Sequence, residues 1–186
     1  MDSIVAGFFG AIVVVVILMD IAQSIVVPRR VPRWSRPTSF AVVFLWLLWR
    51  GIGIRLRSRE LRETFLASFG PLAVILLLLV WAISLVLGYG LILEALRLQI
   101  RPPPENLSDA IYFAGTAFLT IGFGDLVPRG GGARVVALMA GGSGLGLFAL
   151  VISFLYSLYG SFQEREVAVV ALEASAGAPP SGVTML

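Results

Sequence analysis

Three long apolar runs limit what this chain can fold into more than any other feature. They cover about residues 4–27, 65–96 and 134–159, and each is long enough to cross the hydrocarbon core of a bilayer as a helix. Lipid offers no hydrogen-bond partners to backbone groups, so such runs must satisfy these groups internally. The 186 residues are 58% hydrophobic and 13% charged, about half the charged fraction of a soluble domain. We therefore predict an all-α integral membrane protein.

The residue inventory excludes several classes of chemistry. The chain has no Cys and no His, which excludes disulfides, thiol catalysis, histidine switches and cysteine–histidine zinc sites. Nothing in the sequence supports an enzyme or a bound cofactor. The net charge of +3 comes from 14 arginines without a lysine, and most of them flank apolar runs. We expect these arginines to meet a membrane surface rather than a nucleic acid.

Arginine positions also predict the orientation of the chain in the cell membrane. Residues 28–37 and 50–63 hold nine arginines, whereas residues 97–134 hold four together with three acidic side chains. By the positive-inside rule, the first two stretches are cytoplasmic and the third is external. The N-terminus, which has no basic signal-peptide region, is then external and the C-terminus is cytoplasmic. The apolar run at 39–49 is too short to span, so we expect an interfacial helix; the alternative makes 39–54 a fourth span.

The second arginine cluster resembles a voltage sensor only superficially. A sensor carries arginines at every third residue of a helix that crosses the membrane. Here the intervals from Arg50 to Arg62 are five, two, two and three residues, and they fall outside the apolar runs. Binding of anionic lipid at the cytoplasmic face is the better interpretation.

A short helix is predicted between the second and third runs. Residues 101–106 include three prolines, and residues 107–119 then read as a helix with Asn106 or Ser108 as its cap and Asp109 in its first turn. About 13 residues cannot cross a bilayer, so this helix must enter the membrane and stop there. Its partially negative C-terminal end would point toward the residues that follow.

Those residues, 120–125, read T-x-G-x-G-D. A lone G-x-G-D is a common tight turn, but a glycine-rich strand at membrane depth is tolerated only where protein buries it or where it lines a water-filled path. Turning successive carbonyls toward one axis forces alternate residues into backbone conformations that suit glycine, which explains Gly122 and Gly124. Aligned carbonyls can replace the water around a dehydrated potassium ion. The predicted ligands are the carbonyls of Thr120, Ile121, Gly122 and Phe123 and the hydroxyl of Thr120.

About residues 68–160 resemble the tetrameric potassium channel superfamily. The resemblance rests on the residues TIGFGD at 120–125 with Pro128 downstream, between two apolar runs. This form of the motif is similar to two-pore-domain potassium channels, but the motif occurs once here. The whole chain resembles bacterial single-pore channel proteins. The implied fold is a pore module of outer helix, re-entrant pore helix, filter and inner helix, preceded by an extra transmembrane helix and a basic interfacial helix.

The resemblance implies roles for matching residues. A homotetramer would surround transported K⁺ with the carbonyls of residues 120–123, and Gly124 would complete the filter. Asp125 would lie at the outer mouth. Tyr112 and Phe113 match aromatic positions that pack around the filter, and Thr116 stands where some channels have an acid. Phe123 departs from the usual tyrosine, and Leu119 replaces a usual second threonine.

Two further positions carry alternative interpretations. Gly144 matches the hinge glycine of the inner helix, but the glycines at 141–146 could also permit close helix packing. As a hinge, Gly144→Ala would change the open probability without changing selectivity. Asp20 lies inside the first run, where a carboxylate is a functional candidate. We favour a structural pair with Arg50 or another cytoplasmic arginine, or a shallow position that water reaches.

The sequence divides into residues 1–63 with the extra helix and basic segment, 64–160 with the pore domain, and 161–186 as a disordered cytoplasmic tail. Potassium-selective passive conduction is the favoured function. A non-selective cation channel and a non-conducting subunit or scaffold remain as alternatives. The apolar Phe123 argues against the former, and the paired glycines argue against the latter.

Overall fold

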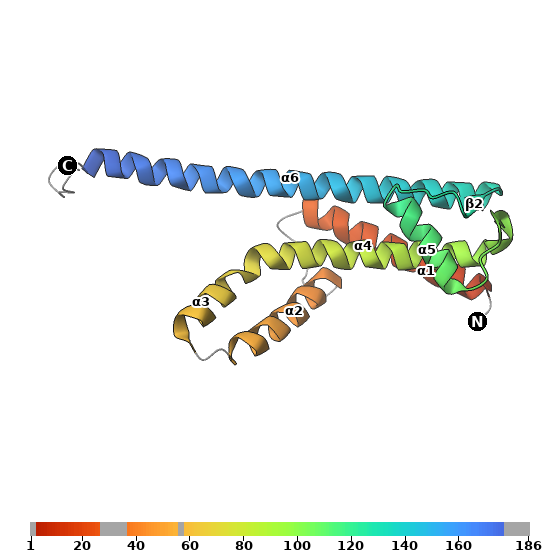
Figure 1. The fold of residues 1–186 in the computed structure, drawn as a ribbon, viewed down its shortest axis with the longest axis horizontal. Helices are drawn as coiled ribbons and strands as arrows, with labels where there is room; N and C mark the ends of the chain where they lie inside the picture. The colour runs from red at the N-terminus through yellow and green to blue at the C-terminus, as the bar shows by residue number, and fades with distance from the viewer. Residues whose placement is uncertain (1–2, 27–36, 56–57, 177–186) are drawn as a thin grey trace. The chain divides into compact units, whose positions relative to one another are not determined.

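The computed structural model describes residues 3–26, 37–55 and 58–176, and the chain is mostly helical over these ranges (Figure 1). It divides into two compact units, residues 1–147 and 148–186, and α6 contributes to both. The elements are α1 (Ser3–Val26), α2 (Pro37–Gly53), α3 (Arg59–Ala67), α4 (Phe69–Ala95), the 3₁₀ turn η2 (Arg97–Gln99), β1 (Ile100–Arg101), α5 (Leu107–Phe118), β2 (Val127–Pro128) and α6 (Gly131–Ala176).

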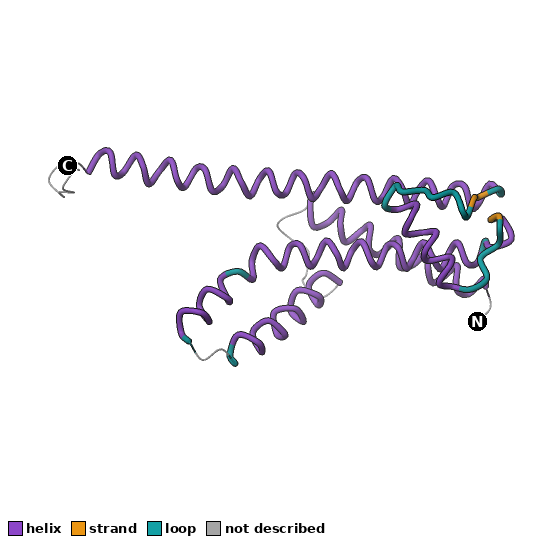
Figure 2. Tube along the Cα trace, viewed as in Figure 1, coloured by secondary structure: helices purple, strands orange, loops and turns teal. Residues whose placement is uncertain are grey.

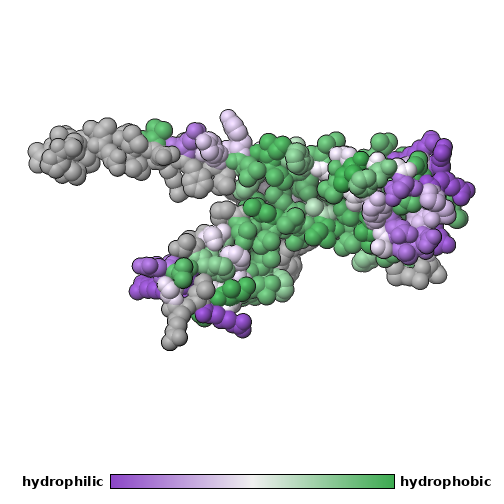
Figure 3. Space-filling view, viewed as in Figure 1, coloured by the Kyte–Doolittle hydropathy of each residue, from purple (hydrophilic) through white to green (hydrophobic). Residues whose placement is uncertain are grey.

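Among the residues that the structure describes, three helices are long and apolar enough to cross a membrane, which confirms the three predicted apolar spans. Their apolar stretches are Ser3–Ser24 in α1, Leu72–Ala95 in α4 and Gly131–Tyr156 in α6. Hydrophobic side chains cover the middle of the first unit in Figure 3, and hydrophilic ones gather at the end that carries the loops around α5. The apolar part of α2, Val42–Gly53, is shorter than a span. Its position at the interface stays a prediction.

Glycines bring α1 and α4 into close contact. A Cβ on Gly10 would lie 2.6 Å from the carbonyl oxygen of Gly88, and one on Gly88 would lie 2.8 Å from Val14. Gly7 faces Ala95 in the same way. Small residues drive helix association in lipid because they let backbones approach and gain van der Waals contact. Helix α1 therefore packs closely along α4.

Helix α4 also supports α5 and α6. Its residues Leu85, Tyr89 and Leu93 recur every fourth position and are at most 1% exposed. The Tyr89 hydroxyl lies 2.7 Å from that of Ser143 on α6. Gly90 leaves room for Ile111 of α5, whose Cα would lie 2.9 Å from an added Cβ. One helix thus holds both of the elements that flank the T-x-G-x-G-D segment.

A two-stranded pairing and the hydrogen bonds of Gln99, together called the clamp here, join the loops on both sides of that segment (Figure 2). Strands β1 and β2 pair antiparallel, with Ile100 opposite Pro128. The Gln99 carbonyl accepts hydrogen bonds from the amides of Arg129 and Gly130. The Gln99 side chain accepts another from Ala133 at the start of α6. The chain entering α5 is therefore tied to the chain leaving the segment.

Three expectations are corrected by the structure. The fold is mostly helical rather than all-α, because β1 and β2 form the two-stranded clamp. The run beginning near residue 65 divides at Ser68, where α3 ends and α4 begins. Helix α6 continues to Ala176, so disorder from residue 161 is wrong for 161–176. The helix breakers glycine and proline are absent from 161–176 and return only at 177, and residues 177–186 lie outside the described ranges.

Candidate ion pathway

The start of α5 is fixed by a side-chain cap. Asn106 has extended backbone angles, and its side-chain oxygen accepts a hydrogen bond of 3.1 Å from the Asp109 amide. The Asp109 carboxylate in turn accepts one of 3.0 Å from the Glu105 amide. These bonds satisfy donors that a helix start leaves free. Of the two caps that the sequence allowed, Asn106 is the one used.

The body of α5 is anchored by its apolar face. Ala110 and Ala114 are fully buried, and Phe113 and Phe118 are 6% and 4% exposed. Thr116 is 7% exposed, and its hydroxyl donates to the Phe113 carbonyl at 3.0 Å. Phe113 and Thr116 are thus buried side chains of α5, and their role in supporting a filter stays a prediction.

The end of α5 leads directly into the T-x-G-x-G-D segment. The Thr116 carbonyl accepts hydrogen bonds from the amides of Ile121 at 2.9 Å and Gly122 at 3.3 Å. The Thr120 amide donates to Ala117 at 3.0 Å. These bonds replace the next helical turn and hold the first residues of the segment against the helix end. The carboxyl end of a helix dipole, which is partially negative, thus adjoins residues 120–122.

Backbone angles along the segment alternate in sign. Thr120, Gly122 and Gly124 have positive φ values of 57°, 58° and 83°, and Thr120 is the one non-glycine with positive φ among the described residues. The left-handed region costs glycine little and a β-branched residue much more. The positive φ values expected at both glycines are present. The positive φ at Thr120 was not predicted, because the sequence suggested only that its hydroxyl is an ion ligand.

Residues 119–125 are all exposed in the single chain, including Ile121 at 49% and Phe123 at 68%. Beside them a groove of about 790 Å³ runs between α5, the segment and α6. Its lining includes Thr116, Thr120, Gly122, Leu138, Gly141 and Leu145.

Tyr112 and Asp125 form a pair that sequence reasoning missed. The Tyr112 ring lies parallel to that of Phe123, with centroids 6.4 Å apart. A hydrogen bond to Asp125 is the main cause that raises the pKa of the Tyr112 hydroxyl above 10.0, since the carboxylate favours the protonated donor; desolvation adds to it. Tyr112 therefore brings a hydroxyl to the segment that Phe123 lacks. Spacing alone gave no signal for this pair.

Gly144 packs against the end of α5. A Cβ at this position would overlap the carbonyl group of Phe118. Gly141 also approaches α5, with 3.3 Å from an ideal Cβ to the Ala117 carbonyl oxygen, whereas Gly142 and Gly146 have open space. The structure thus shows close packing at Gly144, and the hinge stays a prediction. Phe118 is two residues from Thr120, so Gly144 lies close to the start of the T-x-G-x-G-D segment.

Asp20 belongs to the contact between α1 and α4. Its side chain is 3% exposed, and one carboxylate oxygen accepts a hydrogen bond of 2.9 Å from Nε1 of Trp81. The indole of Trp81 on α4 is thus one partner of Asp20, and the pair with Arg50 or another cytoplasmic arginine stays a prediction. Asp20 lies apart from the T-x-G-x-G-D segment and contributes to the attachment of α1.

Among the arginines at 50–62 that the structure describes, none lies on a helix long and apolar enough to span a membrane. Arg50 belongs to α2, of 17 residues, and Arg59 and Arg62 belong to α3, of nine. Arg59 pairs with Glu63 at 3.0 Å on the surface. This arrangement agrees with the rejection of a voltage sensor.

Comparison with known proteins gives one family and one relative. Residues 73–160 match a protein family described as an ion channel. The chain is 30% identical over 104 residues to the uncharacterized membrane protein YdjJ of Bacillus subtilis (strain 168). That alignment covers 54% of this chain and 30% of the relative, so the chain spans about a third of the relative's length. No solved structure matches significantly.

The matched residues contain α5, the T-x-G-x-G-D segment and the apolar spans on both sides of it, with only the first residue of α4's span outside. The match is to channels and not to enzymes, as the residue inventory predicted. Residues 73–160 therefore form an ion-channel domain in a mostly helical, multi-pass membrane protein.

Proposed function

We propose that this protein is a potassium-selective channel that conducts K⁺ passively through a homotetrameric pore. The alternating backbone of residues 120–124 carries the proposal, because positive φ at Thr120, Gly122 and Gly124 turns successive carbonyls toward the same side. The carbonyls of residues 120–123 and the Thr120 hydroxyl replace the hydration shell, and ions move by mutual repulsion between adjacent sites. Asp125 lies at the outer mouth.

Selectivity for potassium is supported by the kind of ligand. Non-selective cation pores use rings of acidic side chains, whereas potassium filters use backbone carbonyls. Phe123 places an apolar ring at a position where an acidic side chain would let the pore conduct other cations besides K⁺. Its ring stacks against Tyr112, which supports the strand from behind.

Fourfold assembly is supported by the exposed segment and by the single direction from which one chain can offer carbonyls. A single strand offers carbonyls from one direction, and a dehydrated ion needs oxygens on every side. The segment is exposed, and the groove beside it is lined by residues of α5, the segment and α6. We propose that a second copy of the chain fills this groove, and that four copies close the pore.

Ion flux into liposomes that contain only this protein tests the proposal. We expect K⁺ flux to exceed Na⁺ flux in the wild type. Gly122→Ala and Gly124→Ala should abolish this preference or the flux itself, because a Cβ is strained at φ of 58° and 83°. Gly131→Ala is the matched control, since a Cβ there meets no atom within 4 Å.

Each other outcome identifies an alternative. Equal K⁺ and Na⁺ flux in the wild type would indicate a non-selective cation channel. No flux from a folded wild-type protein would indicate a non-conducting subunit. Unchanged ion preference in both glycine variants would remove the filter assignment.

A further inference from the structure

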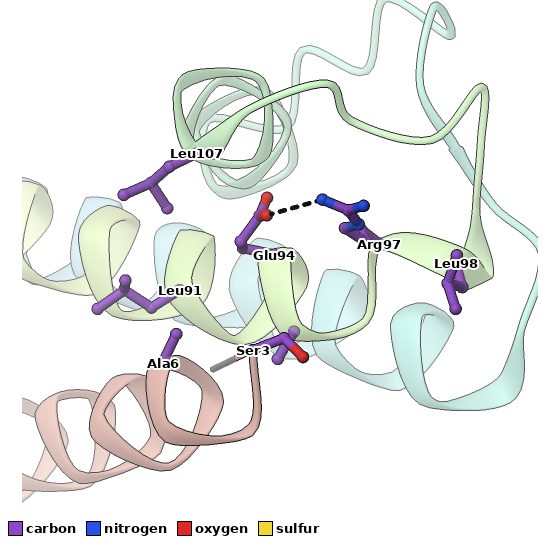
Figure 4. A pocket seen from close by; sticks show the side chains of 8 residues that line it. Ser3, Ala6, Leu91, Glu94, Arg97, Leu98 and Leu107 are labelled. Carbon is purple, nitrogen blue, oxygen red and sulfur yellow. Dashed lines mark ion pairs between the residues drawn. The ribbon is translucent and has the colours of Figure 1, made fainter. Parts of the chain in front are cut away.

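A second pocket lies where α1 begins and α4 ends, beside the start of α5 (Figure 4). Its volume is about 560 Å³. The pocket is lined by a carboxylate, a guanidinium and apolar side chains, and Figure 4 shows these side chains as sticks. The lining residues used below are Ser3, Ala6, Leu91, Glu94, Arg97 and Leu107.

Glu94 has an unused hydrogen-bond acceptor in this pocket. Its side chain is 19% exposed, and its oxygen Oε1 lies 3.7 Å from Nη1 of Arg97, which is an ion pair beyond hydrogen-bond distance. The other oxygen, Oε2, is buried and has no hydrogen-bond partner among the described residues. A buried acceptor without a donor is unfavourable, and a charged one more so. A ligand that brings an N–H group would relieve this cost.

Arg97 supplies the complementary charge. Its side chain is 51% exposed, so its guanidinium can contact a second group while it stays beside Glu94. The planar guanidinium suits phosphate, which it can bind through two parallel hydrogen bonds. A ligand with a cationic amine and a phosphate a few bonds apart would therefore match both residues.

The depth of the pocket identifies the source of such a ligand. Glu94 is the second-last residue of the apolar stretch Leu72–Ala95, and Ser3 is the first residue of Ser3–Ser24. The ends of two spans lie at the level of lipid headgroups. Below the charges, Ala6 and Leu91 offer an apolar surface for an acyl chain.

We propose that this pocket binds a zwitterionic phospholipid with a primary ammonium headgroup, such as phosphatidylethanolamine. The Glu94 carboxylate turns Oε2 toward the pocket and accepts a hydrogen bond from the ammonium. The phosphate contacts Arg97, and the hydrocarbon lies along Ala6 and Leu91. A quaternary ammonium has no N–H and cannot make the first bond. The lipid would also touch Leu107, the first residue of α5.

Native mass spectrometry of the purified protein in mild detergent tests the site. Phosphatidylethanolamine, phosphatidylcholine and phosphatidylglycerol with identical chains are added in turn. We expect retention of phosphatidylethanolamine to exceed that of phosphatidylcholine about tenfold, as one additional charge-assisted hydrogen bond would give. Equal retention of the two would overturn the proposal.

Variants assign the preference to residues. Glu94→Gln should remove the preference for phosphatidylethanolamine, and Arg97→Gln should lower the retention of both zwitterionic lipids. Ser3→Trp keeps both charges and narrows the pocket, so it should lower retention without depending on Glu94. Glu63→Gln is the control, because Glu63 pairs with Arg59 on the distant surface of α3. A preference that survives Glu94→Gln, or retention that Ser3→Trp leaves unchanged, would overturn the site.

Soluble phosphoethanolamine separates a lipid from a free headgroup. We expect it to leave phosphatidylethanolamine retention unchanged at equal concentration, because it lacks the hydrocarbon that Ala6 and Leu91 contact. Displacement would overturn the lipid assignment in favour of a soluble amine phosphate. Retention is measured without ion flux, so a failure here is distinct from a failure of the proposed potassium conduction.

Discussion

At the residue scale, Phe123 is supported by an arrangement that the T-x-G-x-G-D motif does not encode. Tyr112 stacks on Phe123, and Asp125 raises the pKa of the Tyr112 hydroxyl, so one residue of α5 interacts with two positions of the segment. The raised pKa of the Tyr112 hydroxyl gives the sign of its pH dependence. The bond is fully present below the ordinary pKa of 10.0 and is lost as pH rises through the higher folded-state value.

We predict that Tyr112→Phe keeps the stacking but shortens the time for which the filter stays conductive, because Asp125 loses its donor. Single-channel recording at neutral pH measures this time. Asp125→Asn keeps an acceptor without the charge and should have a smaller effect. In the double variant the two effects should not add, since both act on one bond; full additivity would show that the pair is independent.

At the element scale, α6 closely approaches the end of α5, which leads into the proposed filter segment. Gly144 lies against the Phe118 carbonyl, and the Tyr89 hydroxyl links α4 to Ser143, the residue before it. Movement of α6 at this level therefore reaches the residues that precede Thr120. Gating and ion preference are expected to be coupled here rather than separate.

We predict that Gly144→Ala changes both open probability and ion selectivity. The added methyl must displace the end of α5 or α6, and such overpacking costs about 1–3 kcal/mol. Single-channel recording in mixed K⁺ and Na⁺ measures both properties. Gly146→Ala is the matched control, because a Cβ there meets nothing within 4 Å in the chain. Altered open probability with unchanged selectivity would favour a hinge remote from the filter.

At the scale of the whole molecule, the number of chains in the assembly and their orientation in the membrane can be measured directly. We predict that the protein purified in mild detergent has a mass of about four chains of 20.0 kDa. One T-x-G-x-G-D segment per chain requires four copies to surround an ion. Native mass spectrometry or light scattering gives the mass, and a monomer that conducts would refute fourfold assembly.

Labelling of single cysteines should define the orientation, because the chain has none of its own. Cysteines at positions 3 and 108 should react with an impermeant thiol reagent from outside the cell. A cysteine at position 35, which lies outside the described residues, should react only from inside. External labelling at 35 would favour the model with a fourth span, since Arg29 to Arg36 would then be external.

Much of this molecule was determined by local sequence and by partition into lipid. Apolar length defined the three spans, Asn106 defined the start of α5, and the spacing of Gly122 and Gly124 predicted their positive φ. Each of these properties depends on a few neighbouring residues or on the cost of unpaired backbone in hydrocarbon. Even the continuation of α6 to Ala176 was present in the sequence, as a stretch without helix breakers.

Tertiary structure decided which distant residues meet. The bond from Trp81 to Asp20 joins positions 61 apart, and the clamp at Gln99 reaches Ala133 across 34. The contact of Gly144 with Phe118 and the interaction of Tyr112 with Asp125 arise in the same way. No spacing rule encodes such pairs, because they depend on how packed helices align their faces. Sequence thus determined the elements and the backbone of the filter segment, and packing determined what supports it.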